Sequence, residues 1–361
     1  MTATNSARGA GALLVVGLPG LELDAESAAL LAEVRPGGVI LFKHNVASAE
    51  QLGELIAGVR RAAPGALLYS DSEGGRVDRL GGIVGPAPAA GALARFPAEV
   101  AGRAGRRVGE SLRLFGYDVD FAPVVDLDRG LAANALDGRY LGASPEAVEE
   151  RAAAFLDGLH AAGVGGCLKH FPGLGPSTGD THFETGLVDR SADELEEDLA
   201  PFARLAAAAG MVMIAHAVYP ALDPARRPAS VSGPIARDLL RGRLGFEGVA
   251  VADDLGMQAL EPVGDAADRA EAALDAGCDA LPLCRGLADA PAVVERLEKG
   301  SLAARVRRAR ERLDGYRRHR ASLRPDLRRE ALPAPGDLET VRSRLAELGR
   351  EVARQVEDEV S

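Results

Sequence analysis

Short apolar runs with the composition of β-strands recur along most of this sequence. Several of them are bordered by glycine or proline, which interrupt regular structure. The runs are residues 12–16, 38–42, 66–70, 118–122, 166–168, 211–215, 248–252 and 279–283. Their number is a first indication of fold class, because an α/β barrel has eight strands.

Longer segments with alanine, leucine, glutamate and arginine at helical spacing separate these runs. They are residues 26–31, 49–62, 98–115, 145–162, 192–209, 232–240 and 266–276. Alternating strands and helices predict a parallel sheet, because a parallel pair needs a crossover that is usually helical. A closed (β/α)8 barrel and an open doubly wound sheet both satisfy this pattern. The strand count and the positions of the polar residues favour an α/β fold with a TIM-type barrel.

Polar side chains follow several of the predicted strands, whereas the strand interiors are almost wholly apolar. These residues are Asp71 after the third run, Asp126 and Asp128 after the fourth, Lys169 and His170 after the fifth, His216 after the sixth, and Asp253 and Asp254 after the seventh. In α/β barrels the active site lies at the C-terminal ends of the strands, where the loops converge. The sequence therefore predicts an active site at that end of the barrel.

The chain changes character after Gly300, where it becomes rich in arginine and keeps a helical pattern until a proline-containing segment. A second, amphipathic helix is predicted over residues 338–360. We therefore predict a catalytic barrel over residues 1–300 and a C-terminal helical extension over residues 301–361. The arginine-rich run is either a surface for a partner or nucleic acid, or a solvated helix face. Nearby acidic residues and the acidic overall charge favour the solvated face.

Composition narrows the classes of partner. The chain has 361 residues, 47% of them hydrophobic and 26% charged, as in globular proteins. Its formal charge of −11 argues against a broad phosphate-binding surface. The apolar run at residues 12–17 is too short for a signal-peptide core or a membrane span. We expect a cytoplasmic protein that binds neither nucleic acid nor membrane and is a monomer or weak homo-oligomer. We also expect its three cysteines to be buried thiols: Cys167, Cys278 and Cys284.

The densest group of reactive side chains lies in residues 168–186, a long segment with four glycines and two prolines. Ordered loops of this length in compact domains are usually functional. Asp180 and His182 are two residues apart, so the carboxylate can orient the imidazole, which then gives and takes a proton near neutral pH. The alternative is a surface loop in which an acid and a histidine coincide by chance.

Two acids, Asp253 and Asp254, come directly after a fully apolar run. A carboxylate at this position suits covalent attack on the anomeric carbon of a sugar. The alternative is a helix N-cap, which is a common role for aspartate after a strand. Both roles are compatible, with Asp253 catalytic and Asp254 capping.

Residues 71–79, DSEGGRVDR, combine acids, paired glycines and two arginines, which suits hydrogen bonding to hydroxyl groups. The alternative is a salt-bridged turn. Neither a P-loop nor a dinucleotide-binding pattern is present in the sequence. Metal ligands would have to come from scattered loops, because no H-E-x-x-H or paired-cysteine spacing occurs. We therefore expect neither a metal nor a cofactor.

Seven motifs in order connect this sequence with a known family. They are PGGVILFKHNVASAEQL, DSEGGRVDRL, DVDFAPVVDL, GRYLG, KHFPGLG followed by DTH, MIAHAVYP and GFEGVAVADDLGM. With these motifs, which lie between residues 14 and 284, the chain resembles the family 3 glycoside hydrolases. It is most similar in pattern to their single-domain bacterial β-N-acetylglucosaminidases.

The resemblance implies a role for each matching residue. It implies Asp253 as nucleophile, His182 as general acid/base and Asp180 as its orienting partner. The sugar-binding residues that it implies are Asp71, Arg79, Arg139, Lys169 and His170. Two positions depart from the family pattern: Ala252 replaces the usual serine before the nucleophile, and Leu174 replaces the second histidine of K-H-F-P-G-H-G. The second departure can affect loop dynamics or subsite preference.

The expected activity is removal of terminal β-linked N-acetylglucosamine by a retaining, exo-acting hydrolase through a covalent intermediate. Peptidoglycan-derived fragments are the substrate that the resemblance suggests. A glycoside phosphorylase on the same scaffold is the closest alternative, because a histidine acid/base does not repel phosphate. A non-catalytic sugar-binding barrel is the alternative from another class.

Overall fold

The computed structural model of the protein describes residues 9–130, 136–177, 186–299, 301–323 and 334–360. Eight strands pair in parallel in two groups, in the order β4-β3-β2-β1-β8 and β5-β6-β7. Their bounds are β1 Leu14–Gly17, β2 Gly38–Ile40, β3 Leu67–Ser70, β4 Val119–Asp120, β5 Leu168–Phe171, β6 Met211–Ile214, β7 Val249–Ala252 and β8 Leu281–Leu283.

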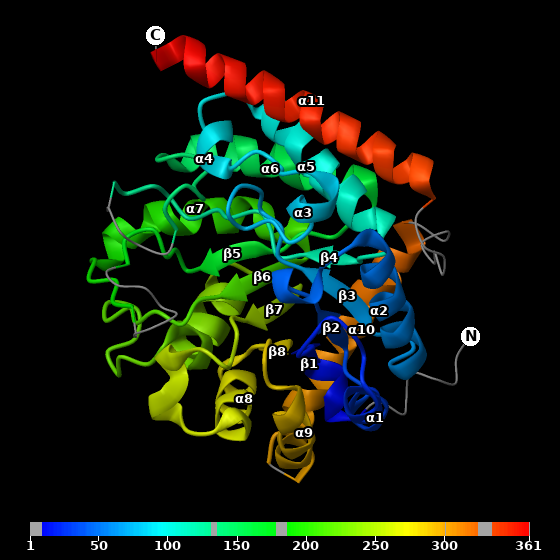
Figure 1. Ribbon diagram of the computed structural model, residues 1–361. Coiled ribbons are helices and arrows are strands. Elements are labelled where there is room, and N and C mark those ends of the chain that lie inside the picture. The colour runs from blue at the N-terminus through cyan, green and yellow to red at the C-terminus, as the bar shows by residue number, and fades with distance from the viewer. Residues whose placement is uncertain (1–8, 131–135, 178–185, 300, 324–333, 361) are drawn as a thin grey trace.

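Backbone hydrogen bonds also connect the two groups of strands at both edges. At one edge, the Asp120 amide donates to the Gly165 carbonyl oxygen at 2.8 Å, and Cys167 donates to Ala122 at 2.8 Å. At the other, Ala252 donates to the Ala280 carbonyl oxygen at 3.0 Å. Each strand thus has a parallel neighbour on either side, and the helices lie outside the strands (Figure 1). This arrangement is the predicted TIM-type α/β fold.

The helices that cover the strands largely follow the predicted segments. The longer ones are α1 Ala25–Val34, α2 Ala49–Ala62, α5 Ala98–Leu114, α6 Pro145–Ala162, α7 Ala192–Ala209, α8 Ala266–Ala276, α9 Ala290–Lys299, α10 Ala303–Leu323 and α11 Pro335–Val360. Two single-turn helices, α3 Gly81–Val84 and α4 Ala90–Leu93, follow β3. The segment between β6 and β7 forms a π-helix, Pro234–Arg243. Helix α9 was not among the predicted segments.

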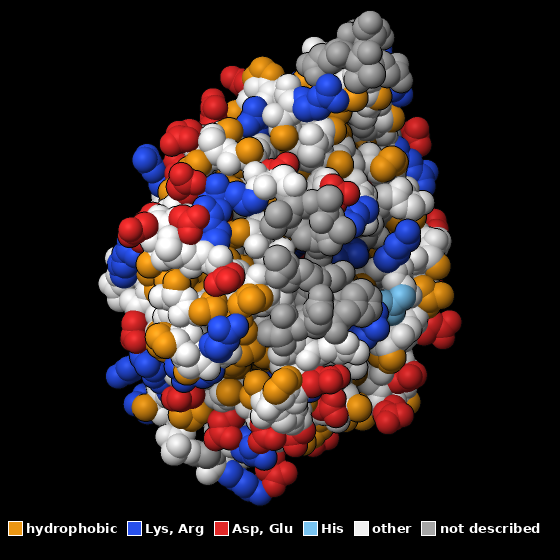
Figure 2. Space-filling model, turned by 90° about the vertical axis from the view of Figure 1, so that its left-hand side faces the viewer, with side chains coloured by type: hydrophobic (Ala, Val, Ile, Leu, Met, Phe, Trp, Pro, Cys, Tyr) orange, Lys and Arg blue, Asp and Glu red, His pale blue; other side chains and the backbone are white. Residues whose placement is uncertain are grey.

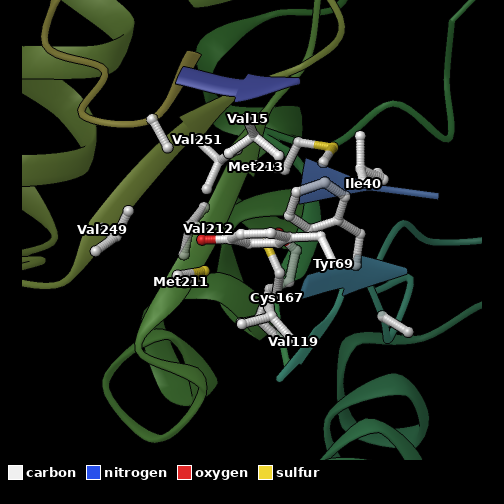
Figure 3. Close-up of a cluster of buried hydrophobic side chains, with 14 of the residues drawn as sticks. Val15, Ile40, Tyr69, Val119, Cys167, Met211, Val212, Met213, Val249 and Val251 are labelled. Carbon is white, nitrogen blue, oxygen red and sulfur yellow. The ribbon is translucent and has the colours of Figure 1, made fainter. Parts of the chain in front are cut away.

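Apolar side chains from the strands fill the inside of the ring (Figure 3). Tyr69 of β3 lies among them, fully buried, and its ring centroid is 5.2 Å from that of Phe121. Cys167 is one of these core residues, and Cys278 and Cys284 are also buried thiols, as predicted. A packed interior of this kind leaves only the strand ends available for chemistry.

Helix α10 lies against the N-terminal ends of the strands and uses arginines to do so. The Arg317 guanidinium donates to the carbonyl oxygen of Gly37, just before β2, at 2.8 Å. Arg320 is buried and donates to the carbonyl oxygens of Asp118 and Gly163, which precede β4 and β5. Arg312 pairs with Asp279 at 3.1 Å. The prediction of a solvated helix face is therefore wrong for this side of α10, because these arginines bind groups at the strand starts that α10 covers.

Helix α11 packs across α5 on the outside of the barrel (Figure 1). Its apolar stripe, Val341, Leu345, Leu348 and Val352, is buried. A bidentate ion pair joins Glu351 to Arg103 of α5 at 2.6 and 2.8 Å. The predicted amphipathic helix thus buries its apolar face against the barrel helices. Among the described residues, no helix is long and apolar enough to cross a membrane.

Helices α5 and α6 approach closely through glycine, which gives a test of the fold. A Cβ on Gly158 would lie 2.2 Å from the Gly102 carbonyl oxygen and 2.5 Å from the Arg106 amide nitrogen. Because both are backbone atoms, Gly158→Ala is expected to force the helices apart and to lower the free energy of unfolding by about 1–3 kcal/mol. Urea denaturation measures the change.

The control is Gly315→Ala in α10, where the nearest atom to the added Cβ is 3.9 Å away. This variant is expected to gain about 0.5–1 kcal/mol, because alanine loses less backbone entropy than glycine on folding. Equal stability of the two variants would mean that the α5–α6 contact is not tight.

Candidate active site

A cavity of about 1050 Å3 opens at the C-terminal ends of the strands. Six of the eight predicted site residues line it: Asp71, Arg79, Arg139, Lys169, His170 and Asp253. The other two, Asp180 and His182, lie outside the described residues. Residues far apart in the sequence are thus brought to one pocket by the parallel order of the strands.

One wall of the cavity is a chain of alternating charges. Asp71, directly after β3, accepts from Lys169 Nζ at 2.5 Å and from Arg79 Nη2 at 2.5 Å. Lys169 also pairs with Glu73. Arg139 donates to both oxygens of Glu73 at 2.6 and 2.7 Å. The network holds two carboxylates and three cations, so it has one net positive charge.

These charges keep each other ionised although they are buried or half-buried. Burial opposes ionisation of Asp71, but the Lys169 and Arg79 charges hold the pKa of its carboxyl well below the usual range. Burial likewise opposes ionisation of Glu73, and Lys169 and Arg139 lower the pKa of that group. The two carboxylates raise the pKa of Lys169 against the effect of burial. Such a network is a rigid set of hydrogen-bond donors and acceptors.

His170 is fixed by a carboxylate behind it. Asp126 lies 2.7 Å from His170 Nδ1 and also accepts from the backbone amides of His170 and Leu174. A carboxylate only accepts, so Nδ1 carries a proton and donates to Asp126. Leu174, the departure from the family motif, is buried and lines the cavity. At the position of the second histidine of K-H-F-P-G-H-G, this protein therefore has an apolar side chain in the cavity lining.

Asp253 follows β7 on the opposite part of the cavity lining. Its amide donates to the Ile214 carbonyl oxygen of β6 at 3.0 Å, and its Oδ1 accepts from the Asp254 amide at 2.8 Å. Asp254 Oδ1 accepts from the amides of Gly256 and Cys284 at 3.1 and 3.0 Å. Asp254 therefore caps the turn after β7 and ties it to the end of β8. It is not a helix N-cap, because a turn follows it.

Two residues of the site had no role assigned from the sequence. Glu73 lies inside the DSEGG motif, but only its pairing with Lys169 and Arg139 shows that it balances the buried cations. Asp126 was recognised as a polar residue after the fourth strand, and its contact with His170 explains its position. Both are buried charges, which require partners that local sequence does not reveal.

The outer part of the cavity has a different character. Lys43 and Arg285 are exposed there, beside the uncharged Gly256, Met257 and Gln258. Figure 2 views the molecule from the end to which the strands point, where basic and acidic side chains are interspersed.

Among the described residues, no group of three or more His, Cys, Asp or Glu side chains is arranged to hold a metal ion.

Substitution of Asp120 in β4 tests whether this buried carboxyl group is ionised. It is fully buried, its Oδ1 accepts from the Ser72 amide at 2.8 Å, and Oδ2 has no hydrogen-bond partner among the described residues. Burial raises the pKa of this carboxyl well above the usual range. Asp120→Asn is therefore expected to change the free energy of unfolding by about 1 kcal/mol or less, because burial favours the uncharged form and an amide oxygen can still accept from the Ser72 amide.

Asp120→Ala is expected to cost about 2–3 kcal/mol, because the Ser72 amide loses its acceptor and a cavity forms. Thermal and urea denaturation at pH 7 compare the two variants. If the asparagine variant were as unstable as the alanine variant, Asp120 would be an ionised member of the network.

A parallel α/β barrel with carboxylates and charged hydrogen-bond donors around a cavity at the C-terminal ends of its strands has the features of an enzyme. The comparison with known sequences identifies the class: residues 10–314 match the family described as Glycosyl hydrolase family 3 N terminal domain. The chain belongs to glycoside hydrolase family 3, and it is therefore a glycoside hydrolase.

Named relatives cover most of the chain. A β-hexosaminidase of Pseudomonas aeruginosa PAO1 is 39% identical over 306 residues, which are 84% of this chain and 91% of the relative. One from Stenotrophomonas maltophilia K279a is 41% identical over 282 residues, 75% of this chain and 83% of the relative.

Solved structures agree with this assignment. The family 3 β-N-acetylglucosaminidase of Paenibacillus sp. FPU-7 superposes with a TM-score of 0.82 at 28% identity, covering 96% of this chain and 69% of that one. The β-N-acetylhexosaminidase of Beutenbergia cavernae has a TM-score of 0.77 at 30% identity, covering 85% of this chain and 97% of that one.

Proposed function

We propose that the protein is a retaining, exo-acting β-N-acetylhexosaminidase that removes terminal β-linked N-acetylglucosamine. The observation that carries the proposal is that Asp253 shares one cavity with the network of Asp71, Arg79, Arg139 and Lys169. The network supplies fixed donors and acceptors for the hydroxyl groups of one sugar. A sugar held there can present its anomeric carbon to the Asp253 carboxylate.

The proposed reaction is a double displacement. Asp253 attacks the anomeric carbon while His182, oriented by Asp180, protonates the departing glycosidic oxygen. In the second step His182 takes a proton from water, and the water oxygen displaces Asp253. Two inversions give net retention at the anomeric carbon. Assignment of His182 and Asp180 rests on the family motif in the sequence.

Hydrolysis of matched aryl β-N-acetylglucosaminide and aryl β-glucoside substrates, with and without inorganic phosphate, tests the proposal. We expect turnover of the N-acetyl substrate that is faster than that of the glucoside and insensitive to phosphate. Stimulation by phosphate with a sugar 1-phosphate as product would identify a phosphorylase. Sugar binding without turnover would identify a binding barrel.

We further propose that the natural aglycone carries a carboxylate, as the muramic acid of peptidoglycan fragments does, and that the enzyme works on such fragments in the cytoplasm. The support is the exposed pair Lys43 and Arg285 at the outer part of the cavity, where the lining residues from 256 to 258 are uncharged. Cations at such a rim favour an anionic group beyond the first sugar.

The double variant Lys43→Gln with Arg285→Gln tests this preference. It is expected to raise KM about 2–30-fold for an N-acetylglucosaminyl-muramic acid disaccharide, because two exposed ion pairs contribute about 0.2–1 kcal/mol each. The KM for neutral chitobiose is expected to stay unchanged. An equal effect on both disaccharides would contradict an anionic aglycone.

A further inference from the structure

His216, which follows β6, is a buried histidine that the proposed reaction does not use. It is 1% exposed and does not line the cavity. Its Nε2 lies 2.9 Å from the backbone carbonyl oxygen of Asp254, and its Nδ1 lies 2.7 Å from the hydroxyl oxygen of Ser230. The ring therefore bridges the turn after β7 and the segment around Ser230.

These two partners determine the tautomer of the ring. A carbonyl oxygen accepts and does not donate, so Nε2 must carry the proton. A neutral ring then has a bare Nδ1, which accepts from the Ser230 hydroxyl. Ser230 is itself held in place, because its amide donates to the Ala215 carbonyl oxygen at 3.0 Å and it is fully buried. The imidazole is thus anchored from one side and donates on the other.

The surroundings favour the neutral imidazole. Burial is the main cause that lowers the pKa of His216. The Asp253 and Asp254 carboxylates and the hydrogen bond to the Asp254 carbonyl oppose this effect, and Arg269 adds to it. A neutral ring suits a fixed donor better than a group that exchanges protons with substrate.

The Asp254 backbone connects the ring with Asp253. The Asp254 amide donates to Asp253 Oδ1 at 2.8 Å. The directions of the Asp254 amide and the Asp254 carbonyl are linked, because the φ and ψ angles of Asp254 relate them. The Asp253 amide is bound to Ile214 in β6 on the other side. His216 therefore binds the carbonyl end of the two-residue segment that bears the carboxylate, in addition to the bonds of the Asp254 side chain to Gly256 and Cys284.

We propose that His216, oriented by Ser230, is a positioning residue that holds the Asp253–Asp254 segment so that the Asp253 carboxylate is aimed at the anomeric carbon. The inference rests on the proposed function, because it assumes that Asp253 is the nucleophile. The physical effect is orientation: a displacement of about 1 Å at a reacting atom costs about 100-fold in rate.

The test compares His216→Leu, His216→Gln and Ser230→Ala with wild type. The leucine variant lacks the donor, and kcat is expected to fall about 100-fold with a much smaller change in KM. The glutamine variant can place an amide N–H near the Nε2 position, so it is expected to recover most of the rate. Ser230→Ala is expected to have an intermediate effect, because the ring keeps its donor but loses its anchor. His160→Leu, on α6 at the opposite end of the barrel, is the control for the same substitution at a partly buried histidine away from the cavity.

Two further readouts separate positioning from a general structural role. The first is the rate at which a fluorinated N-acetylglucosaminyl fluoride labels Asp253, which reports the attack step alone. It is expected to fall in parallel with kcat in the leucine variant, with the shape of the pH–rate profile unchanged. The second is the nitrogen NMR spectrum of His216 at pH 8, above the ordinary histidine pKa of about 6.5, which is expected to show the Nε2–H tautomer.

The outcomes are distinguishable. Equal labelling rates in wild type and His216→Leu would overturn the positioning role while leaving the proposed function intact. Labelling at another carboxylate in wild type would refute the proposed nucleophile and with it this role. A proton on Nδ1 of neutral His216 would contradict the hydrogen-bond assignment by itself, whatever the activity.

Discussion

Asp253→Ala is expected to lower kcat for an aryl β-N-acetylglucosaminide by at least about 10^4-fold, because the covalent route is lost. The fold is expected to survive, because the Asp253 backbone amide keeps its bond to Ile214 and Asp254 keeps its bonds to Gly256 and Cys284. Binding of the product sugar is expected to change little, because the charged network on the other wall is untouched. Steady-state kinetics and titration calorimetry with N-acetylglucosamine measure the two quantities.

Asp128→Ala is the matched control. Asp128 also follows a strand, but it is exposed and its Oδ1 accepts from the Gly130 amide, so it is not part of the cavity lining. This variant is expected to keep wild-type kcat. Near-normal turnover in the Asp253 variant would remove the nucleophile assignment, and failure of that variant to bind the sugar would indicate a role in binding.

Lys169→Met is expected to lower the free energy of unfolding by about 3–5 kcal/mol and to abolish most activity. Lys169 is 2% exposed and pairs with both Asp71 and Glu73. Removing its charge leaves one cation fewer for two buried carboxylates. Their pKa values should therefore rise, and the loss of stability should be smaller at low pH, where the carboxylates take up protons.

The sign of this pH dependence follows from the lowered pKa values of Asp71 and Glu73 in the wild type. A depressed carboxyl pKa stabilises the fold above the unfolded-state pKa of about 4, and this contribution is lost as pH falls. The difference in unfolding free energy between wild type and Lys169→Met should thus shrink as pH falls from about 5 towards 3. Urea denaturation across this range measures it.

Lys43→Met provides the control for Lys169→Met, because it makes the same substitution at an exposed position of the same cavity. It is expected to change stability by less than about 0.5 kcal/mol. A comparable loss in both variants would show that the network is not stabilised by Lys169 in the way that we infer.

Several elements could be predicted from local pattern alone. The predicted helices 49–62, 145–162, 192–209 and 266–276 have the same bounds as α2, α6, α7 and α8. Each has a clear start signal or apolar periodicity, and such signals need no information from the rest of the chain. The strands were located by the same reasoning, because a short apolar run between two helices is typical of a buried strand.

The fifth strand shows where local pattern is insufficient. The sequence predicted residues 166–168, whereas β5 is Leu168–Phe171 and contains Lys169 and His170. Charged residues resemble a loop unless their partners are known. Here Asp71 and Glu73 from the β3 end and Asp126 from the β4 end surround them, so burial in a strand is possible.

The arginine-rich run shows the same limitation at the other end of the barrel. Its composition indicated a solvated helix, and exposed Arg307 and Arg308 agree with that. Arg317 and Arg320 instead donate to carbonyl oxygens at the starts of distant strands. The Gly37 and Asp118 carbonyl oxygens also accept from the backbone amides of Leu67 and Gly165, so the arginines add a second donor to them. No pattern within the run shows that α10 will lie across these groups.

The sequence by itself determined the α/β class, most helix positions, the glycoside hydrolase motifs and six of the residues that line the cavity. Those features depend on local periodicity and on short motifs, which can be read without coordinates. Only the tertiary structure decided how Glu73 balances the buried cations, why Asp126 orients His170, and that His216 holds the backbone beside Asp253. These roles depend on contacts between residues distant in sequence, where the energy of a buried charge or donor is set by the partner that the fold brings to it.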